Sequence, residues 1–376
     1  MRIMYIAPRY HTNQTDIIRG WHRQGDQVLF VAHYKAPIED YQDITPVVLG
    51  YSVWYELFDR IYVKLNYHKN MRAIDLRIKA GFPSRRKLAH LMNRFEPDLV
   101  IMRERSLYSV VAFSLCRKYG YKAVLYNQSP LWDKPYKDDF WHRLIKRHTP
   151  RFRMTPVMGL QNHANVKDPD AFFVPFVKEP GVAPRQRTYF QNDRINILEV
   201  GKFEPRKNHI MLMQTAWNLS EKYKIHVTII GEATGIYQKQ HYQEVIKFRD
   251  DNHLQELIDI HINVPHGEMK DWYEQADLFV MPSTEEMASV SQLEAMAYAV
   301  PVICSDTNGS ACYVDNGKSG YLFQNMNQAD LQDKMEKMLS EREQILKMGN
   351  SSYYDVCEKY GFANYCDVIM QMIKLQ

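Results

Sequence analysis

Short runs of apolar residues alternate along this chain with longer stretches in which apolar positions recur every three to four residues. The short runs predict buried strands and the longer stretches predict helices. In the first half, strands are predicted over 3–7, 28–32, 98–102 and 122–126, and helices over 16–24 and 106–118. Strands that alternate with helices are typical of a doubly wound parallel sheet, so the sequence indicates the α/β class.

The alternation returns after a stretch without periodicity over 172–194, which contains three prolines and is typical of an interdomain linker. Strands are then predicted over 195–200, 225–230, 257–262, 278–281, 300–304 and 321–323, and helices over 209–222, 237–250, 268–274, 289–298 and 328–339. We therefore expect two Rossmann-like domains, 1–178 and 179–350. A helical stretch over about 352–374, within the segment 351–376, is expected to pack back toward the first domain.

Charge is distributed unevenly between the two predicted domains, although the net charge of the 376 residues is only +4. Residues 1–178 hold 29 Lys/Arg and 16 Asp/Glu, and residues 179–376 hold 19 and 28, so the halves carry +13 and −9. This asymmetry predicts that the first half faces an anionic partner such as a membrane surface, a phosphorylated substrate or nucleic acid. The chain has no recognised nucleic-acid-binding motif, so no nucleic acid is expected.

Two segments of the first half carry most of this positive charge. The segment 51–95 reads as mainly helical and contains Arg60, Lys64, Lys69, Arg72, Arg77, Lys79, Arg85, Arg86, Lys87 and Arg94. The segment 132–148 mixes aromatic and basic residues. Such a composition suits docking on an anionic bilayer, and the alternative is a solvated basic face.

Several classes of protein are disfavoured. The five scattered cysteines form no C-x-x-C pair, the first residues lack a signal-peptide pattern, and no run of 18 apolar residues occurs. We expect a cytoplasmic protein, peripheral on the inner face of the cell membrane. The pattern Asp168-Pro-Asp170 reads as turn chemistry, and H-E-x-x-H, G-x-G-x-x-G and P-loop motifs are missing from the sequence, so neither a metal nor a cofactor is expected.

A polar segment follows the strand predicted over 278–281. Its helix begins near Ser289, so the backbone N–H groups of the first turn offer an anion pocket. Glu286 and Glu294 stand eight positions apart and can face one ligand from different heights. Carboxylates accept hydrogen bonds from sugar and ribose hydroxyls, so the segment suits a nucleotide sugar. The alternative is that Ser289 only caps a helix and Glu286 is an ordinary first-turn acid.

A second candidate segment, 199–208, follows the first strand of the second domain. Gly201 ends the strand, and Lys202 and Lys207 flank the turn at the edge of the sheet where ligands bind, able to hold a diphosphate. A solvated turn is the alternative.

Together the two segments resemble the retaining GT-B glycosyltransferases of family 4. The resemblance covers the second domain and rests on Gly201-Lys202 with Lys207, Pro282-Ser283 with Glu286, Glu294-Ala295-Met296, Pro301-Val302-Ile303 and Gly320-Tyr321-Leu322-Phe323. It implies a GT-B architecture, in which two Rossmann-like domains face each other across a cleft. It also implies that Glu286 binds donor-sugar hydroxyls, that Glu294 binds the ribose, that the amides of Ala288, Ser289 and Val290 bind the phosphates, and that Lys207 and Lys202 stabilise the leaving diphosphate.

The chain departs from the family pattern at three places. Met287-Ala288-Ser289 replaces Gly-Phe-Gly after the first glutamate. Residues 8–14 replace a glycine-rich loop, which leaves His11 and Asn13 as candidate residues of the cleft. Asn127 or Gln128 stands where many relatives have a histidine, so no general base is predicted.

The sequence therefore predicts a retaining, metal-independent hexosyltransferase that uses a nucleotide diphosphate sugar, a UDP-sugar rather than a GDP-sugar. The resemblance also implies that the departing phosphate oxygen accepts the proton of the acceptor. The acceptor would be a saccharide or lipid-linked saccharide of cell-surface polysaccharide synthesis, bound by the basic first domain. Two alternatives are a nucleotide-sugar 2-epimerase of the same fold and a non-catalytic subunit that only binds a nucleotide or partner.

Overall fold

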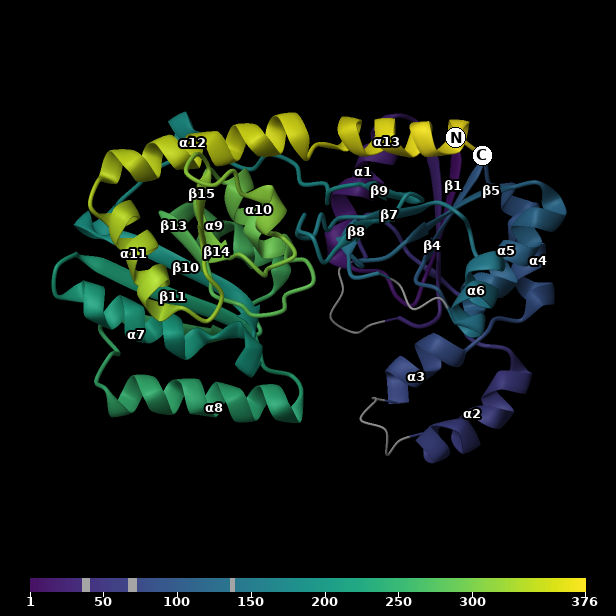
Figure 1. Cartoon of the computed structure of the whole chain (residues 1–376), viewed down its shortest axis with the longest axis horizontal. Coiled ribbons are helices and arrows are strands. Elements are labelled where there is room, and N and C mark those ends of the chain that lie inside the picture. The colour runs from purple at the N-terminus through teal and green to yellow at the C-terminus, as the bar shows by residue number, and fades with distance from the viewer. Residues whose placement is uncertain (36–40, 67–72, 136–138) are drawn as a thin grey trace. The chain divides into compact units, whose positions relative to one another are not determined.

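A computed structural model describes residues 1–35, 41–66, 73–135 and 139–376. The chain divides into two compact units, of which the first contains Met1–Val177 and Phe362–Gln376 and the second contains Lys178–Gly361 (Figure 1). Two basic positions of the sequence analysis, Lys69 and Arg72, and residues 136–138 of the aromatic and basic segment lie outside the described residues.

The first unit contains a parallel sheet whose strand order is β3-β2-β1-β4-β5-β7-β9. The strands are β1 (Arg2–Ala7), β2 (Gln27–Ala32), β3 (Val47–Val48), β4 (Leu99–Arg103), β5 (Lys122–Tyr126), β7 (Arg153–Thr155) and β9 (Ala171–Phe173). A separate antiparallel pair is formed by β6 (Trp132–Asp133) and β8 (Val166–Lys167). The four strands predicted from apolar runs form the centre of this sheet.

Helices α1 (Thr15–Arg23) and α13 (Phe362–Lys374) cover one face of the first sheet, and α4 (Arg85–Phe95) and α5 (Leu107–Tyr119) cover the other. The unit also contains α2 (Val53–Asn66), α3 (Ala73–Ala80) and α6 (Phe140–Arg147). Alternate strand residues enter two cores. Ile3 and Tyr5 pack with residues of α1 and α13, whereas Met4 and Ile6 pack with residues of α4 and α5. Burial on both faces explains why these strands read as continuous apolar runs.

The second unit repeats this plan with a parallel sheet in the order β12-β11-β10-β13-β14-β15. The strands are β10 (Ile195–Lys202), β11 (Ile225–Glu232), β12 (Ile258–Ile262), β13 (Leu278–Met281), β14 (Val302–Ser305) and β15 (Gly320–Phe323). The helices are α7 (His209–Ser220), α8 (Ile236–Asp251), α9 (Met269–Gln275), α10 (Val290–Ala297), α11 (Gln328–Leu339) and α12 (Arg342–Lys359). The expected α/β class with two Rossmann-like sheets is confirmed.

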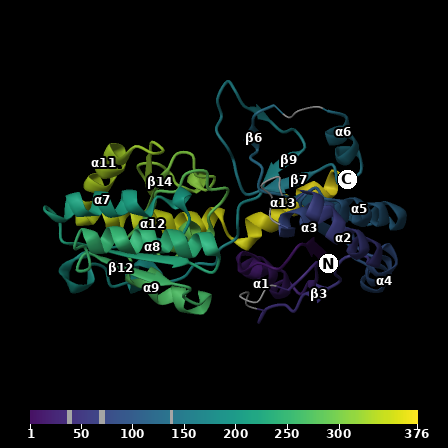
Figure 2. The same cartoon turned by 90° about the horizontal axis from the view of Figure 1, so that it is seen from below.

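The helical stretch expected over 352–374 is divided in two near Gly361. Its first part belongs to α12, which lies in the second unit and packs against α10. Its second part is α13, which lies in the first unit (Figure 2). Phe362 of α13 packs edge-on against Trp21, with ring centroids 5.0 Å apart. A β-carbon at Gly20 would lie 2.1 Å from the Phe362 ring, so this glycine makes room for α13.

Candidate active site

Two loops of the second unit meet at one edge of its sheet. β10 and β13 are adjacent parallel strands, so the loops that follow them emerge at the same edge. The loops are joined by hydrogen bonds from the Thr284 amide to the Arg206 carbonyl, 2.7 Å, and from Asn208 Nδ2 to the Pro282 carbonyl, 2.8 Å. The two segments that the sequence singled out are therefore brought together.

Glu286 accepts hydrogen bonds from two cations across this junction. Lys207 Nζ lies 2.5 Å from Glu286 Oε2, and Arg206 Nη1 lies 2.7 Å from the same oxygen. Burial of Glu286 opposes its ionisation, but Lys207 and Arg206 outweigh burial and lower the pKa of this carboxyl below its ordinary value of 4.5. The site thus holds the ionised Glu286 and two cations, of which Arg206 also pairs with Glu204 at 2.9 Å.

Gly201 allows Lys207 to cross the end of β10. A β-carbon at Gly201 would lie 3.1 Å from Lys207 Cε and 3.0 Å from Glu199 Oε1. Beneath it, Glu199 and His209 form a fully buried pair in which His209 Nδ1 lies 2.9 Å from Glu199 Oε2. Nε2 of His209 lies 3.2 Å from the Lys202 carbonyl oxygen, so this pair supports the turn that carries Lys207. The sequence analysis did not identify this pair.

The structure places Lys202 apart from Glu286. Its Nζ lies 3.3 Å from Glu232 Oε2, and its side chain is 45% exposed. Arg206 is instead the second cation on Glu286, and the sequence analysis did not identify it. The sequence signal that could have identified Arg206 is its position directly before Lys207. Both residues lie in the short helical turn Pro205–Lys207, and both side chains reach the Glu286 carboxylate.

Glu294 is buried in α10 and has partners that differ from those of Glu286. It accepts hydrogen bonds from Tyr273 Oη, 2.9 Å, and His266 Nε2, 3.0 Å, and Lys178 Nζ lies 3.7 Å away. Burial raises the pKa of Glu294, but the His266 hydrogen bond and the Lys178 charge outweigh burial and lower it. Glu294 is therefore an ionised hydrogen-bond acceptor. Its three partners are distant in the sequence, so nothing in the sequence indicated that they contact Glu294.

The predicted anion pocket at the start of α10 is partly satisfied by the protein itself. The Ser289 amide donates to Ser310 Oγ, and Ser289 Oγ lies 2.8 Å from Ser291 Oγ. Within the described residues, the backbone amides of Ala288 and Val290 donate no hydrogen bond to another backbone group. A phosphate at this position would displace the Ser310 hydroxyl from the Ser289 amide and would add the other two amides.

The loop that carries these amides is held in a strained and close-packed conformation. Glu285 has a left-handed backbone, with φ of 53°, directly before Glu286. A β-carbon at Gly309 would lie 1.7 Å from the Met287 carbonyl oxygen, and the Gly309 amide donates to the Glu286 carbonyl at 2.8 Å. This glycine therefore fixes the backbone on which Glu286 and the three amides lie.

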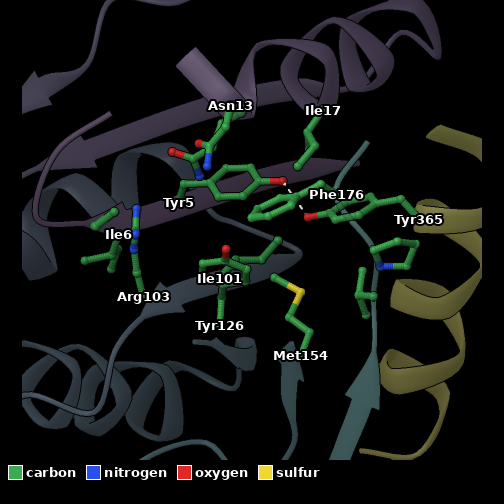
Figure 3. A pocket seen from close by; sticks show the side chains of 14 residues that line it. Tyr5, Ile6, Asn13, Ile17, Ile101, Arg103, Tyr126, Met154, Phe176 and Tyr365 are labelled. Carbon is green, nitrogen blue, oxygen red and sulfur yellow. Dashed lines mark hydrogen bonds between the residues drawn. The ribbon is translucent and has the colours of Figure 1, made fainter. Parts of the chain in front are cut away.

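In the first unit, Asn13 lines a small cavity at the carboxyl ends of β1, β4 and β5, with Tyr5, Arg103, Tyr126 and Tyr365 among the other lining residues (Figure 3). The cavity measures about 30 Å³, room for about one water. The buried Oδ1 of Asn13 accepts no hydrogen bond from the described residues. Tyr5 Oη lies 3.2 Å from Tyr365 Oη, so α13 closes one side of this cavity.

The other candidates of the first unit lie in different surroundings. His11 begins a short turn, in which its carbonyl accepts from the Gln14 amide at 2.9 Å. Gln128 lies near the Tyr126 hydroxyl, where it partly offsets the burial that raises the pKa of Tyr126. Asn127 is buried, and its Oδ1 accepts from Arg153 Nη1 at 3.1 Å. Asn127 is thus placed to hold Arg153.

Both carboxylates of the Asp168-Pro-Asp170 pattern form ion pairs. Asp168 Oδ2 lies 2.7 Å from Arg153 Nε, and Asp170 Oδ1 lies 2.9 Å from Arg151 Nε. Across the part of the chain that the structure describes, no group of three or more His, Cys, Asp or Glu side chains is arranged to hold a metal ion.

The chain is similar to known glycosyltransferases in sequence over part of its length and in fold. The sequence pattern of the family described as Glycosyl transferases group 1 matches residues 184–354. A D-inositol 3-phosphate glycosyltransferase of Frankia alni is 26% identical over 160 residues, which are 41% of this chain and 39% of that protein. The chain is thus matched to less than half the length of such relatives.

Similarity to solved structures extends over both units. A glycosyltransferase from Rickettsia africae has a TM-score of 0.73 at 13% identity, with 100% of this chain and 98% of that one covered. Anabaena HepE, solved in complex with UDP and glucose, has a TM-score of 0.72 at 10% identity, with both chains fully covered. The GT-B fold predicted from the sequence is therefore confirmed.

Proposed function

We propose that this protein is a retaining glycosyltransferase that moves a sugar from a nucleotide diphosphate sugar to a saccharide or lipid-linked saccharide. The observation that carries the proposal is the junction at which Arg206 and Lys207 converge on Glu286, beside the amides of the loop 286–290. Cations and amides suit a diphosphate, and an ionised carboxylate suits sugar hydroxyls. The match of residues 184–354 to group 1 glycosyltransferases supports the same reading.

The donor diphosphate would take Arg206 and Lys207 as its partners. Negative charge grows on the β-phosphate as the bond to the sugar breaks, and buried fixed cations stabilise this charge more strongly than cations in water do. Lys207 is 5% exposed and is therefore the stronger contributor. Lys202 would reach the diphosphate from the strand edge after leaving Glu232, with a smaller effect because its charge is more exposed.

Glu286 would orient the donor sugar rather than attack it. Its carboxylate is paired with two cations and has a lowered pKa, so it is a weak base and a weak nucleophile. A glycosidase-like mechanism also requires a second carboxylate placed across the scissile bond. Proton transfer from the acceptor to the departing phosphate oxygen would make a side-chain base unnecessary.

Glu294 would bind the ribose hydroxyls of the donor. His266, Tyr273 and Lys178 keep this carboxylate ionised and hold it in one position. The complex of Anabaena HepE with UDP and glucose supports a UDP-sugar as the donor. The Frankia alni relative is a D-inositol 3-phosphate glycosyltransferase, and inositol phosphate carries several hydroxyls. For this chain we infer another hydroxylated acceptor, a saccharide of cell-surface polysaccharide synthesis.

Transfer assays test the proposal. We expect the protein to release UDP from a UDP-sugar when an acceptor fraction is added, and to form a glycoside with the anomeric configuration of the donor. Glu286→Gln is expected to reduce transfer about a hundredfold, as the loss of a positioning contact does. Conversion of the donor sugar without an acceptor would instead indicate a 2-epimerase, and binding of UDP without turnover would indicate a non-catalytic subunit.

A further inference from the structure

One side of α2 in the first unit exposes a continuous set of large apolar side chains. They share that side because their spacing follows the helical repeat, and each is 59 to 73% exposed: Val53, Trp54, Leu57, Phe58, Ile61 and Leu65. Figure 1 shows α2 and α3 projecting from the unit, away from its sheet. Contiguous apolar surface of this kind marks a place where another surface binds.

The opposite side of α2 faces the protein with its polar residues. Tyr55 is buried there, and Glu56 and Asp59 form ion pairs with Arg77 of α3 at 2.9 and 3.2 Å. These two are the acidic residues of α2, so its negative charge is neutralised within the unit. The exposed Lys64 adds positive charge to the helix. α2 is thus apolar toward solvent and polar toward the protein. An ordinary surface helix has the opposite arrangement, with its polar side toward solvent.

α6 combines exposed apolar and basic residues in a second place. Phe140 is 64% exposed, and Leu144 and Ile145 are also exposed. At about 100° per residue these three span roughly 140° of the helix surface, and the exposed Arg143, Lys146 and Arg147 occupy the neighbouring part, with Arg147 next to Phe140. An amphipathic helix with an exposed apolar side and a basic side is typical of helices that lie in a membrane interface.

A basic hollow lies beside α6. It is open, measures about 540 Å³, and its charged lining residues are Arg117, Arg143, Lys146, Arg147, Arg151 and Asp170. Asp170 is the one acidic member of this lining, and it pairs with Arg151 at 2.9 Å and Lys146 at 3.5 Å. The positive excess and the open shape suit the phosphate groups of anionic lipids.

We propose that α2 and α6 dock the first unit on a bilayer that contains anionic phospholipids. The apolar side of α2 would enter the boundary between headgroups and acyl chains, and the basic hollow beside α6 would bind headgroup phosphates. A bilayer is favoured over a protein partner by charge complementarity, because the first 178 residues carry +13 and both exposed apolar helices also carry basic residues. No helix among the described residues is long and apolar enough to cross a membrane.

Vesicle flotation of the full chain tests this proposal without a donor or an acceptor, so its outcome is independent of the proposed function. The wild type is expected to float with vesicles of phosphatidylcholine and phosphatidylglycerol and to stay at the bottom with phosphatidylcholine alone. The double variant Trp54→Ser, Leu57→Ser is expected to bind at least about tenfold more weakly. The matched control Ile236→Ser, Tyr237→Ser removes two apolar residues of α8 in the second unit that are even more exposed, and it is expected to bind like the wild type.

The charge contribution is tested with a second matched pair of variants. Lys146→Gln with Arg147→Gln is expected to weaken binding about fivefold per charge, or about thirtyfold in total. Lys239→Gln with Lys347→Gln removes two exposed lysines of the second unit and is expected to leave binding unchanged. The proposal would be overturned if each control variant lost as much vesicle affinity as the variant it is matched to. It would also be overturned if the wild type bound equally to vesicles with and without phosphatidylglycerol.

A spectroscopic readout separates insertion of α2 from a merely structural effect. Brominated lipids are expected to quench part of the tryptophan emission of the wild type, and Trp54→Phe is expected to lose this part while it keeps vesicle binding. The proposal would be refuted if the wild type self-associates in sedimentation, the variant Trp54→Ser, Leu57→Ser is a monomer, and neither protein binds vesicles. This result would identify the apolar side of α2 as a contact between copies of the chain.

Discussion

Replacement of Lys207 by methionine removes the charge of the most buried cation at the candidate site and keeps most of its volume. Lys207 is 5% exposed, and its Nζ lies 2.5 Å from Glu286 Oε2. In an effective dielectric of about 20, a cation about 4 Å from one phosphate charge contributes about 4 kcal/mol. Part of this is offset because the ammonium must leave Glu286. We therefore expect a loss of about 3 kcal/mol in transition-state stabilisation, or at least about a hundredfold in kcat/KM.

Initial rates of UDP release with a UDP-sugar and an acceptor measure this effect. The loss is expected mainly in kcat, because charge on the leaving phosphate grows toward the transition state. Arg206 still pairs with Glu286 in the variant, so the fold is expected to persist, and circular dichroism checks this. Lys222→Met is the control, since Lys222 is 65% exposed and pairs only with residues of the protein surface such as Glu336. A Lys207→Met variant with wild-type kcat and KM would refute the reasoning.

Three further predictions concern other residues. Burial lowers the pKa of His33 from 6.5 to about 3, so His33 is neutral in the folded state above about pH 3. Because the unfolded state binds the proton first, the free energy of unfolding should fall by up to about 1.4 kcal/mol per pH unit as the pH drops from 6.5 toward 3. Denaturant titrations should show that His33→Phe removes this contribution to the slope. Gly20→Ala should destabilise the docking of α13 by about 1–3 kcal/mol, because its β-carbon meets the Phe362 ring, whereas Gly267→Ala, with open space around it, should not lower the unfolding temperature. Glu294→Gln should weaken UDP binding about tenfold in calorimetric titration and leave the affinity for pyrophosphate unchanged. An equal loss of affinity for UDP and pyrophosphate would argue against ribose binding by Glu294.

Much of the fold follows from local patterns that the sequence displays. The apolar runs over 3–7 and 195–200 mark central strands because parallel strands are buried on both faces. The strands Arg153–Thr155 and Ala171–Phe173 were not predicted, since three residues are too few to show a period. The break between α12 and α13 at Gly361 was not predicted because helical periodicity continues on both sides of it.

The candidate site was predictable only where chemistry is carried by a short segment. Glu286 and Lys207 were identified because each stands in a loop directly after a strand. The partners of Glu294 were not, because Tyr273 and His266 come from other elements and meet it only through tertiary packing. Arg206 was missed because only the backbone conformation of its turn brings its side chain to Glu286 together with that of Lys207.

The most direct test of the central claim is thermal unfolding of the full chain with UDP, GDP, CDP and their sugars, for the wild type and Lys207→Met. A ligand at about a hundred times its dissociation constant adds about 2.7 kcal/mol, which raises the midpoint of a unit of this size by roughly 5–10 °C. We predict this rise with UDP and UDP-sugars in the wild type and its loss in the variant. A wild-type midpoint that no nucleotide raises, or a rise that Lys207→Met leaves intact, would contradict the proposed donor site.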